Sequence, residues 1–144
     1  MEYSGARQFA ALIIVRWTGS EMANTNRTRL YLGAAACTGI AGILHLMLVP
    51  NSIIAGIQYA MFFLISGLVQ LFWVLPMVKR WGSVWNIIGF AGTAVLVGLT
   101  GYAVVESISN PQSTPPGVTE LAVAIEIFQI SYVIITAIII FARR

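Results

Sequence analysis

The sequence predicts an all-α integral membrane protein, a bundle of four transmembrane helices with both termini in the cytoplasm. Three observations predict this fold. Hydrophobic residues make up 58% of the chain and charged residues only 9%, whereas roughly 25% of the residues of an average soluble domain are charged. The chain contains four long apolar stretches. If these stretches are helices that cross a membrane, all eight Lys and Arg residues lie on one side of it.

The basic residues predict which side of the membrane each end occupies. They lie before the first stretch, between the second and the third, and after the fourth: Arg7, Arg16, Arg27, Arg29, Lys79, Arg80, Arg143 and Arg144. The two other connections, around residues 50–52 and 106–119, contain none. Because cytoplasmic loops retain Lys and Arg, we expect both termini in the cytoplasm, with the last six of these residues as anchors at that face.

The net charge of +3 fits the same topology. Basic residues beside a membrane are attracted to anionic lipid headgroups, so we expect the lipid bilayer, and not nucleic acid, as the partner of these charges. The protein is therefore expected to be a multi-pass protein of the cytoplasmic membrane. Cys37 is the only cysteine, which excludes an intramolecular disulfide and gives no information on the compartment.

The first two spans are expected at about residues 30–49 and 53–78. The first covers roughly 30 Å as a helix, which matches the hydrocarbon thickness of a bilayer. Between them, the Pro-Asn-Ser sequence at 50–52 is expected to turn the chain. The second span is longer than a bilayer requires, so we expect it to tilt and to end at Lys79 and Arg80.

The third and fourth spans are expected at about residues 83–105 and 118–141. The segment between them, 106–119, contains three prolines and a glycine, which predict a loop. Three tryptophans flank the connection between the second and third spans, as in an interfacial aromatic belt: Trp73, Trp81 and Trp85.

Residues 1–29 are expected to form a segment separate from the four-helix domain of residues 30–144. The apolar sequence Phe9–Val15 is short for a signal peptide, and no Ala-x-Ala site follows it. Two readings are left open. The segment is an interfacial helix on the cytoplasmic surface, or the natural chain begins at Met22 and the preceding residues do not belong to it.

Small residues predict how the helices pack. In lipid, close backbone contact through small side chains replaces the hydrophobic drive for helix association. Ala34, Thr38 and Gly42 recur every four residues and form one small face of the first span. Gly89 and Gly98 supply small positions in the third span. We therefore expect the first and third spans to make the tight central contact.

A group of polar side chains lies toward the outer half of the predicted spans: His45, Gln58, Thr100 and Glu126. An ionisable group within a span costs roughly 2.5–3.5 kcal/mol on insertion scales, so its default interpretation is functional. Three interpretations stay open. His45 and Glu126 form a buried interhelical hydrogen bond or ion pair, Glu126 is a carboxylate linked to protons or a ligand, or these residues contact another subunit or a lipid headgroup.

The sequence contains few residues of the kinds that catalyse reactions or bind metals. One His and one Cys, two turns apart on one predicted helix, are too few ligands for a metal site, and a single His excludes a bis-histidine haem. His45 has no identifiable serine partner for nucleophilic catalysis. We therefore expect no metal, no cofactor and no catalytic residue in this chain alone.

Several short motifs of the first two spans resemble a group of small prokaryotic four-span membrane proteins. The residues that carry this resemblance are Gly42, His45, Leu46, Pro50, Phe63, Gly67 and Gln70. A carboxylate early in the fourth span, here Glu126, fits the same group. The resemblance covers about residues 30–141 and implies the four-helix fold without an activity.

Two functions are weighed against this background. By size and character the chain is similar to the small helical accessory subunits of membrane-bound copper monooxygenases such as archaeal ammonia monooxygenase, which implies a non-catalytic accessory or assembly subunit with other membrane subunits as partners. The alternative is a small proton-linked transporter or sensor that uses Glu126. Small multidrug transporters carry their essential carboxylate in the first span and have a weak charge bias, whereas this chain has only His45 there and a complete bias.

Overall fold

The computed structural model describes the backbone of residues 3–109 and 117–142, and the side chains of these ranges from residue 25 onward. The described chain is helical throughout, apart from short connections, and contains no strand. Its helices are α1 (Tyr3–Ala55), α2 (Ile57–Lys79), α3 (Ser83–Ser109) and α4 (Val118–Phe141). Each helix includes a stretch long and apolar enough to cross a membrane. The all-α fold and the four apolar helices are thus confirmed.

The connection between the first two spans differs from the expected turn at residues 50–52. Pro50 lies inside α1, which continues to Ala55. A proline close to a helix end disrupts little, because it removes few hydrogen bonds. In the same last turns the Ser52 hydroxyl donates to the Leu48 carbonyl at 2.8 Å. The chain turns instead at Gly56, whose φ of 144° is costly for any residue with a side chain.

The third and fourth spans begin where the sequence predicts, but α3 is longer. It continues to Ser109, so residues 106–109 of the predicted loop are helical. The hydroxyls of Ser107 and Ser109 donate to carbonyls one turn earlier, at 2.9 and 2.8 Å, which ties both polar side chains to the last turns. Of the rest of the predicted loop, residues 110–116 lie outside the described residues, and Val118 and Thr119 already belong to α4.

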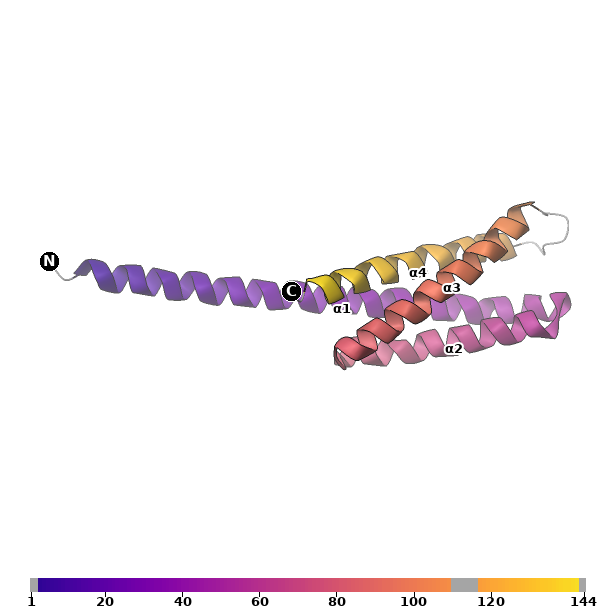
Figure 1. Ribbon diagram of the computed structural model, residues 1–144, viewed down its shortest axis with the longest axis horizontal. Helices are drawn as coiled ribbons and strands as arrows, with labels where there is room; N and C mark the ends of the chain where they lie inside the picture. The colour runs from indigo at the N-terminus through magenta and orange to yellow at the C-terminus, as the bar shows by residue number, and fades with distance from the viewer. Residues whose placement is uncertain (1–2, 110–116, 143–144) are drawn as a thin grey trace.

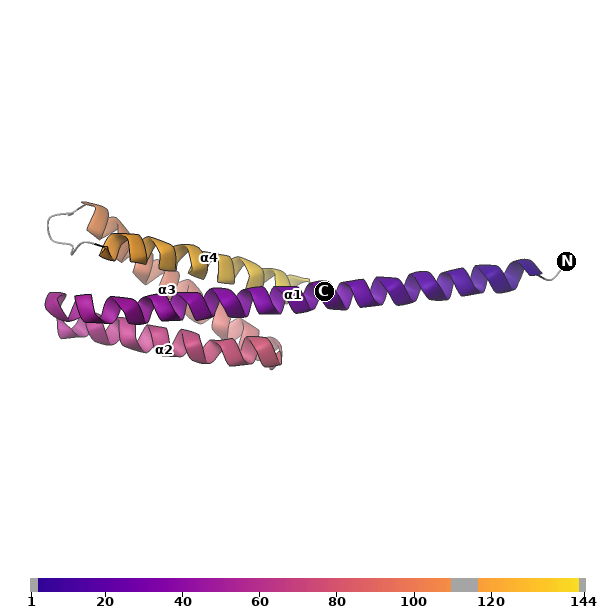
Figure 2. The same cartoon turned by 180° about the vertical axis from the view of Figure 1, so that it is seen from behind.

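The four helices form an incomplete ring, and successive helices run in opposite directions (Figure 1). Helix α1 lies between α2 and α4, as Figure 2 also shows, and α3 packs against α4. Helices α2 and α3 approach each other only sparsely, because α3 runs obliquely from the connection with α2 toward the far end of α4 (Figure 1). The ring α2–α1–α4–α3 is therefore open on one side, which we call the α2–α3 seam.

The tight contact joins α1 to α2, so the predicted contact between the first and third spans is wrong. No close backbone approach of α1 to α3 occurs within the described ranges. A Cβ atom at Gly42 would lie 3.0 Å from the Gly67 carbonyl oxygen, and one at Gly67 would lie 2.9 Å from the Gly42 carbonyl oxygen. Thr38 on the same face donates its hydroxyl to the Gln70 carbonyl at 3.1 Å. The small face of α1 is thus used, with α2 as its partner.

The distribution of side chains differs from that in a water-soluble protein. Large apolar side chains are exposed on all four helices, such as Ile43, Leu68, Val95 and Ile127. Buried positions include many polar side chains: Thr38, His45, Gln70, Asn86, Thr93, Thr100, Gln129 and Thr136. Since soluble proteins bury apolar residues and expose polar ones, this pattern, with the four long apolar helices, indicates a multi-pass membrane protein.

One end of the bundle collects basic and aromatic residues. The Arg80 guanidinium donates to the Thr28 hydroxyl and lies 5.6 Å from the centre of the Tyr31 ring. The connection after α2 and the beginning of the first apolar stretch therefore share one end, as the charge pattern predicts. The predicted aromatic cluster forms here too: the ring of Trp85 lies 5.1 Å from that of Trp81 and 5.7 Å from that of Trp73. Arg143 and Arg144 lie outside the described residues.

The N-terminal segment is continuous with the first apolar stretch. Helix α1 has no break between residues 29 and 30, where the sequence predicts a boundary, and its first half extends as a helix beyond the other three (Figures 1 and 2). The interfacial placement of this segment, and the alternative that the natural chain begins at Met22, stay predictions.

Candidate functional site in the polar core

The structure places three of the four predicted polar residues inside the bundle. His45 and Thr100 are fully buried, and Glu126 is half-buried on α4. Gln58 is exposed at the start of α2, where its amide lies against Gly56. Gln58 is therefore not part of the predicted cluster and belongs to the turn between α1 and α2.

His45 and Glu126 turn to different neighbours. The His45 Nδ1 atom lies 2.9 Å from the Ala41 carbonyl oxygen, which only accepts, so Nδ1 donates; Nε2 has no partner. Phe63 packs beside the ring, with 5.9 Å between the ring centres. The Glu126 carboxylate faces α3, where a Cβ atom at Gly101 would lie 3.4 Å from Oε1. The hydrogen bond or ion pair between His45 and Glu126 is thus not formed.

A layer of buried polar side chains crosses the middle of the bundle, with one member from each helix. Thr38, Gln70, Thr93 and Gln129 are 2%, 3%, 7% and 1% exposed. The first two are joined through the Gln70 carbonyl, and Gln70 and Thr93 line the same cavity. Thr93 of α3 and Gln129 of α4 lie at the same level along the bundle, because two contacts between these helices flank them. Gly89 meets Tyr132 on one side, and Gly101 meets Glu126 on the other.

Several polar atoms in and beside this layer have no hydrogen-bond partner. Both amide atoms of Gln70 and both of Gln129 are buried and unpaired. Toward the basic end, Trp73 Nε1, the Tyr132 hydroxyl and Thr136 Oγ1 are buried near one another without a well-aligned hydrogen bond. Each buried unpaired polar group costs about 1–3 kcal/mol.

Gly89 lets two of these groups converge. The Trp73 indole nitrogen from α2 and the Tyr132 hydroxyl from α4 both lie so close to Gly89 that a Cβ atom at this position would overlap them. Gly89 therefore contributes through the space that it leaves for these side chains, and not through the predicted contact with the first span. At Gly98, a Cβ atom would find no heavy atom of the described part of the chain within 4 Å.

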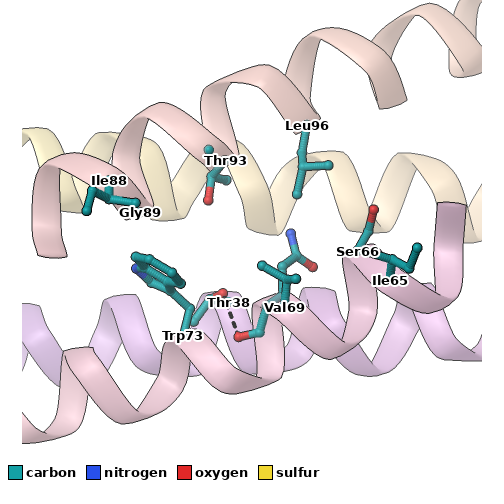
Figure 3. A pocket seen from close by; sticks show the side chains of 11 residues that line it. Thr38, Ile65, Ser66, Val69, Trp73, Ile88, Gly89, Thr93 and Leu96 are labelled. Atoms are coloured by element: carbon teal, nitrogen blue, oxygen red, sulfur yellow. Dashed lines mark hydrogen bonds between the residues drawn. The ribbon is translucent and has the colours of Figure 1, made fainter.

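A cavity of about 300 Å³ lies in the α2–α3 seam beside the polar layer (Figure 3). Thr38 lies at its α1 side, and Trp73 and Thr93 approach it from α2 and α3 (Figure 3). The remaining lining is mainly apolar, from Ile65, Val69, Ile88 and Leu96. The cavity thus combines an apolar wall with the polar layer of the bundle.

Sequence reasoning missed Gln129 and gave little weight to Gln70. Both are single amides within apolar stretches, and this signal was available. Formal charge drew attention to His45 and Glu126 instead, although a buried amide also requires partners. Among the described side chains, no group of three or more His, Cys, Asp or Glu residues comes together.

Comparisons of the chain with protein-family models, with curated proteins and with solved structures found no match. The chain's own residues therefore carry the functional argument.

Proposed function

We propose that this protein is a non-catalytic subunit that packs beside other transmembrane chains and assembles or stabilises a larger membrane complex. The observation that supports this proposal is the outer face of α3, defined by Ala91, Ala94 and Gly98. All three residues are exposed. Helix α3 is also the least covered helix: 17% of its apolar 18-residue stretch is buried inside the bundle, against 39% of that of α1.

The outer face of α3 has the chemistry of a helix contact in lipid. Ala94 and Gly98 are four residues apart, the small-xxx-small spacing that lets two helix backbones approach closely. Among the described residues the spacing has no partner, since a Cβ atom at Gly98 meets none of their heavy atoms within 4 Å. A helix of another chain is the occupant that such a face would select in a bilayer.

The proposed orientation follows from the charges. Arg27, Arg29, Lys79 and Arg80 belong to the basic end. Among the residues whose side chains are described, the acidic ones outside the core, Glu106 and Glu120, belong to the far end. Retention of Lys and Arg in the cytoplasm supports a cytoplasmic basic end, with both termini on that side of the cytoplasmic membrane.

The experiment is purification from native membranes in mild detergent, with mass spectrometry of the co-purifying chains. We expect further membrane subunits, and we propose to look first for those of a membrane-bound copper monooxygenase such as archaeal ammonia monooxygenase, on the analogy of size and helical character. Gly98→Leu should release the partner, because a large side chain keeps the backbones apart. Gly92→Leu, on another face of the same helix, is the matched control. Recovery of the wild-type protein only as a monomer or homodimer would contradict the proposal.

A second candidate, a small proton-linked transporter or sensor, is favoured by one observation. Glu126 lies inside an apolar helix, and its Oε2 atom is buried without a hydrogen-bond partner, as a carboxylate that binds and releases a proton requires. Vesicles that contain the protein should then take up protons under an imposed potassium diffusion potential, and Glu126→Gln should abolish the uptake while assembly persists. Uptake no faster than in protein-free vesicles would rule this candidate out.

A further inference from the structure

We propose that the cavity in the α2–α3 seam holds a hydrocarbon chain of an anionic phospholipid, whose head group lies beside the basic connection between α2 and α3, residues 79–81. This site is separate from the outer face of α3, and the inference does not depend on the proposed assembly function. Three features point to this ligand: the apolar lining of the cavity, its depth below the basic end, and the charges of that end.

The wall that an occupant of the cavity meets is mainly apolar. The polar atoms of the Gln70 amide and the indole nitrogen of Trp73 have almost no accessible surface, so they offer no partner to a ligand. No charged side chain of the described chain lines the cavity. A hydrocarbon chain loses nothing against such a wall, because it has no polar group to leave without a partner. Aliphatic side chains contribute much of the wall: Ile65, Val69, Ile88 and Leu96.

The cavity extends over the depth of about one leaflet of a bilayer. Its lining runs from Ile65 to Trp73 on α2 and from Ile88 to Leu96 on α3 (Figure 3). Eight residues of helix rise about 12 Å, against about 15 Å for half of the hydrocarbon core. Toward the basic end, the rings of Trp73 and Trp85 lie 5.7 Å apart across the seam. A helix of another chain, which must cross the whole core, has no passage there, whereas a lipid chain ends within one leaflet.

The seam is open toward the lipid. Ile65 of α2 and Ile88 of α3 line the cavity and are exposed. Gly92 is exposed as well and adds no side chain, and a Cβ atom there would meet nothing within 4 Å. A lipid chain therefore enters sideways from the bilayer and does not pass through the polar layer.

The basic connection lies at the depth where the head group of this lipid is expected. Trp73, which lines the cavity, is six residues before Lys79 on α2, a distance of about 9 Å along the helix. The head-group region on each side of the hydrocarbon core is about 5–8 Å thick. A chain that lies in the cavity and a phosphate beside Lys79 thus fit one lipid molecule.

Ring contacts connect the cavity to these charges. Trp85, which contacts Trp73, lies 5.1 Å from the ring of Trp81, and Trp81 directly follows Arg80. The Arg80 guanidinium is engaged within the chain, whereas the exposed Lys79 ammonium has no ion-pair partner among the described side chains. Basic residues beside transmembrane helices bind anionic lipid head groups. The charge at this end of the seam therefore selects an anionic lipid over a neutral one.

The test measures lipid binding to the full chain by native mass spectrometry. The protein in detergent micelles is titrated with palmitoyl-oleoyl-phosphatidylglycerol and, in parallel, with the phosphatidylcholine that carries the same two chains. We expect the wild type to bind the first phosphatidylglycerol about fivefold more tightly than the first phosphatidylcholine, the factor that one positive charge contributes at an anionic surface.

Two variants separate the hydrocarbon chain from the head group. Gly92→Leu places a side chain in the open space of the cavity. It should weaken the binding of both lipids about threefold or more, because the displaced chain loses its packing against the wall. Lys79→Gln removes the charge and should weaken only the binding of phosphatidylglycerol, by about fivefold.

Each variant has a matched control that should bind both lipids like the wild type. Gly98→Leu places the same side chain on the same helix, also in open space, but outside the cavity. Arg29→Gln removes a charge from the same end of the bundle. Arg29 is nine residues before Thr38, so it lies on the side of α1 opposite the cavity. Helix content and the thermal transition, followed by circular dichroism, show that each variant is folded.

Three results would overturn the proposal. Equal affinity of the wild type for the two lipids excludes selection by charge. Unchanged binding in Gly92→Leu shows that the hydrocarbon chain does not lie in the cavity. An equal loss of phosphatidylglycerol binding in Arg29→Gln and Lys79→Gln shows a diffuse attraction to the whole basic end in place of a site at the seam.

The same variants separate this inference from the assembly function. Loss of partner subunits in Gly98→Leu with unchanged lipid binding supports both. Retention of the partner subunits in Gly98→Leu contradicts the assembly surface on α3 and leaves the lipid result intact. Loss of lipid binding in Gly92→Leu with unchanged assembly supports the lipid site by itself.

Discussion

At the scale of single residues, the buried polar side chains divide into two kinds. Two buried hydroxyls pair with helix carbonyls, Ser52 with Leu48 at 2.8 Å and Thr38 with Gln70 at 3.1 Å, whereas those of Thr100 and Thr136 do not. The longer amides of Gln70 and Gln129 form no well-aligned hydrogen bond, although Gln70 lies beside His45. The two paired hydroxyls therefore need nothing beyond the fold, whereas an unpaired amide lowers its stability.

Replacing Gln129 with leucine should stabilise the isolated protein. The substitution keeps a similar volume and removes two buried unpaired polar atoms, so we expect the free energy of unfolding to rise by about 1–3 kcal/mol. Unfolding of the protein in detergent micelles measures the change. Thr38→Val is the control in the opposite direction, since it removes a formed hydrogen bond, worth about 0.6 kcal/mol between membrane helices. A less stable Gln129→Leu protein would show that the amide has a partner.

At the scale of elements, the sequence predicted the ends of helices better than their partners. Lys79 and Arg80 end α2 as predicted, because charges are confined to the ends of spans. Pro50 did not end α1, since a proline near a helix end removes few hydrogen bonds, whereas Gly56 adopts a φ of 144°. The partner of the small face on α1 was missed because it depends on a complementary residue elsewhere, which is Gly67.

The contact between α1 and α2 predicts a large difference between two Gly→Ala substitutions. A Cβ atom at Gly67 would lie 2.9 Å from the Gly42 carbonyl oxygen, whereas one at Gly98 meets nothing. We expect Gly67→Ala to lower the free energy of unfolding by about 1–3 kcal/mol, since the helices must separate. Gly98→Ala should be neutral or stabilising by up to about 1 kcal/mol through helix propensity. Denaturant titrations in micelles compare the two, and equal effects would contradict the Gly42–Gly67 contact.

At the scale of the whole molecule, α3 is the helix that the rest of the described chain covers least. It packs closely against α4 alone, so one of its remaining faces borders the seam and the other is directed outward. The membrane character was predictable because composition and charge are properties of the whole chain. The seam and the polar layer were not, because they depend on which helices lie side by side, and small and polar residues occur on every helix.

The placement of the basic end in the cytoplasm makes a prediction about the whole molecule in its membrane. After Cys37→Ser removes the native cysteine, Ser83→Cys and Glu120→Cys place single thiols at the basic end and the far end. Because Lys and Arg are retained in the cytoplasm, a membrane-impermeant maleimide on intact cells should label only Glu120→Cys, and lysis should expose both. Labelling of Ser83→Cys alone would reverse the orientation. Lysed cells are the control for reactivity, since a thiol that stays unlabelled there is buried and not on the wrong side.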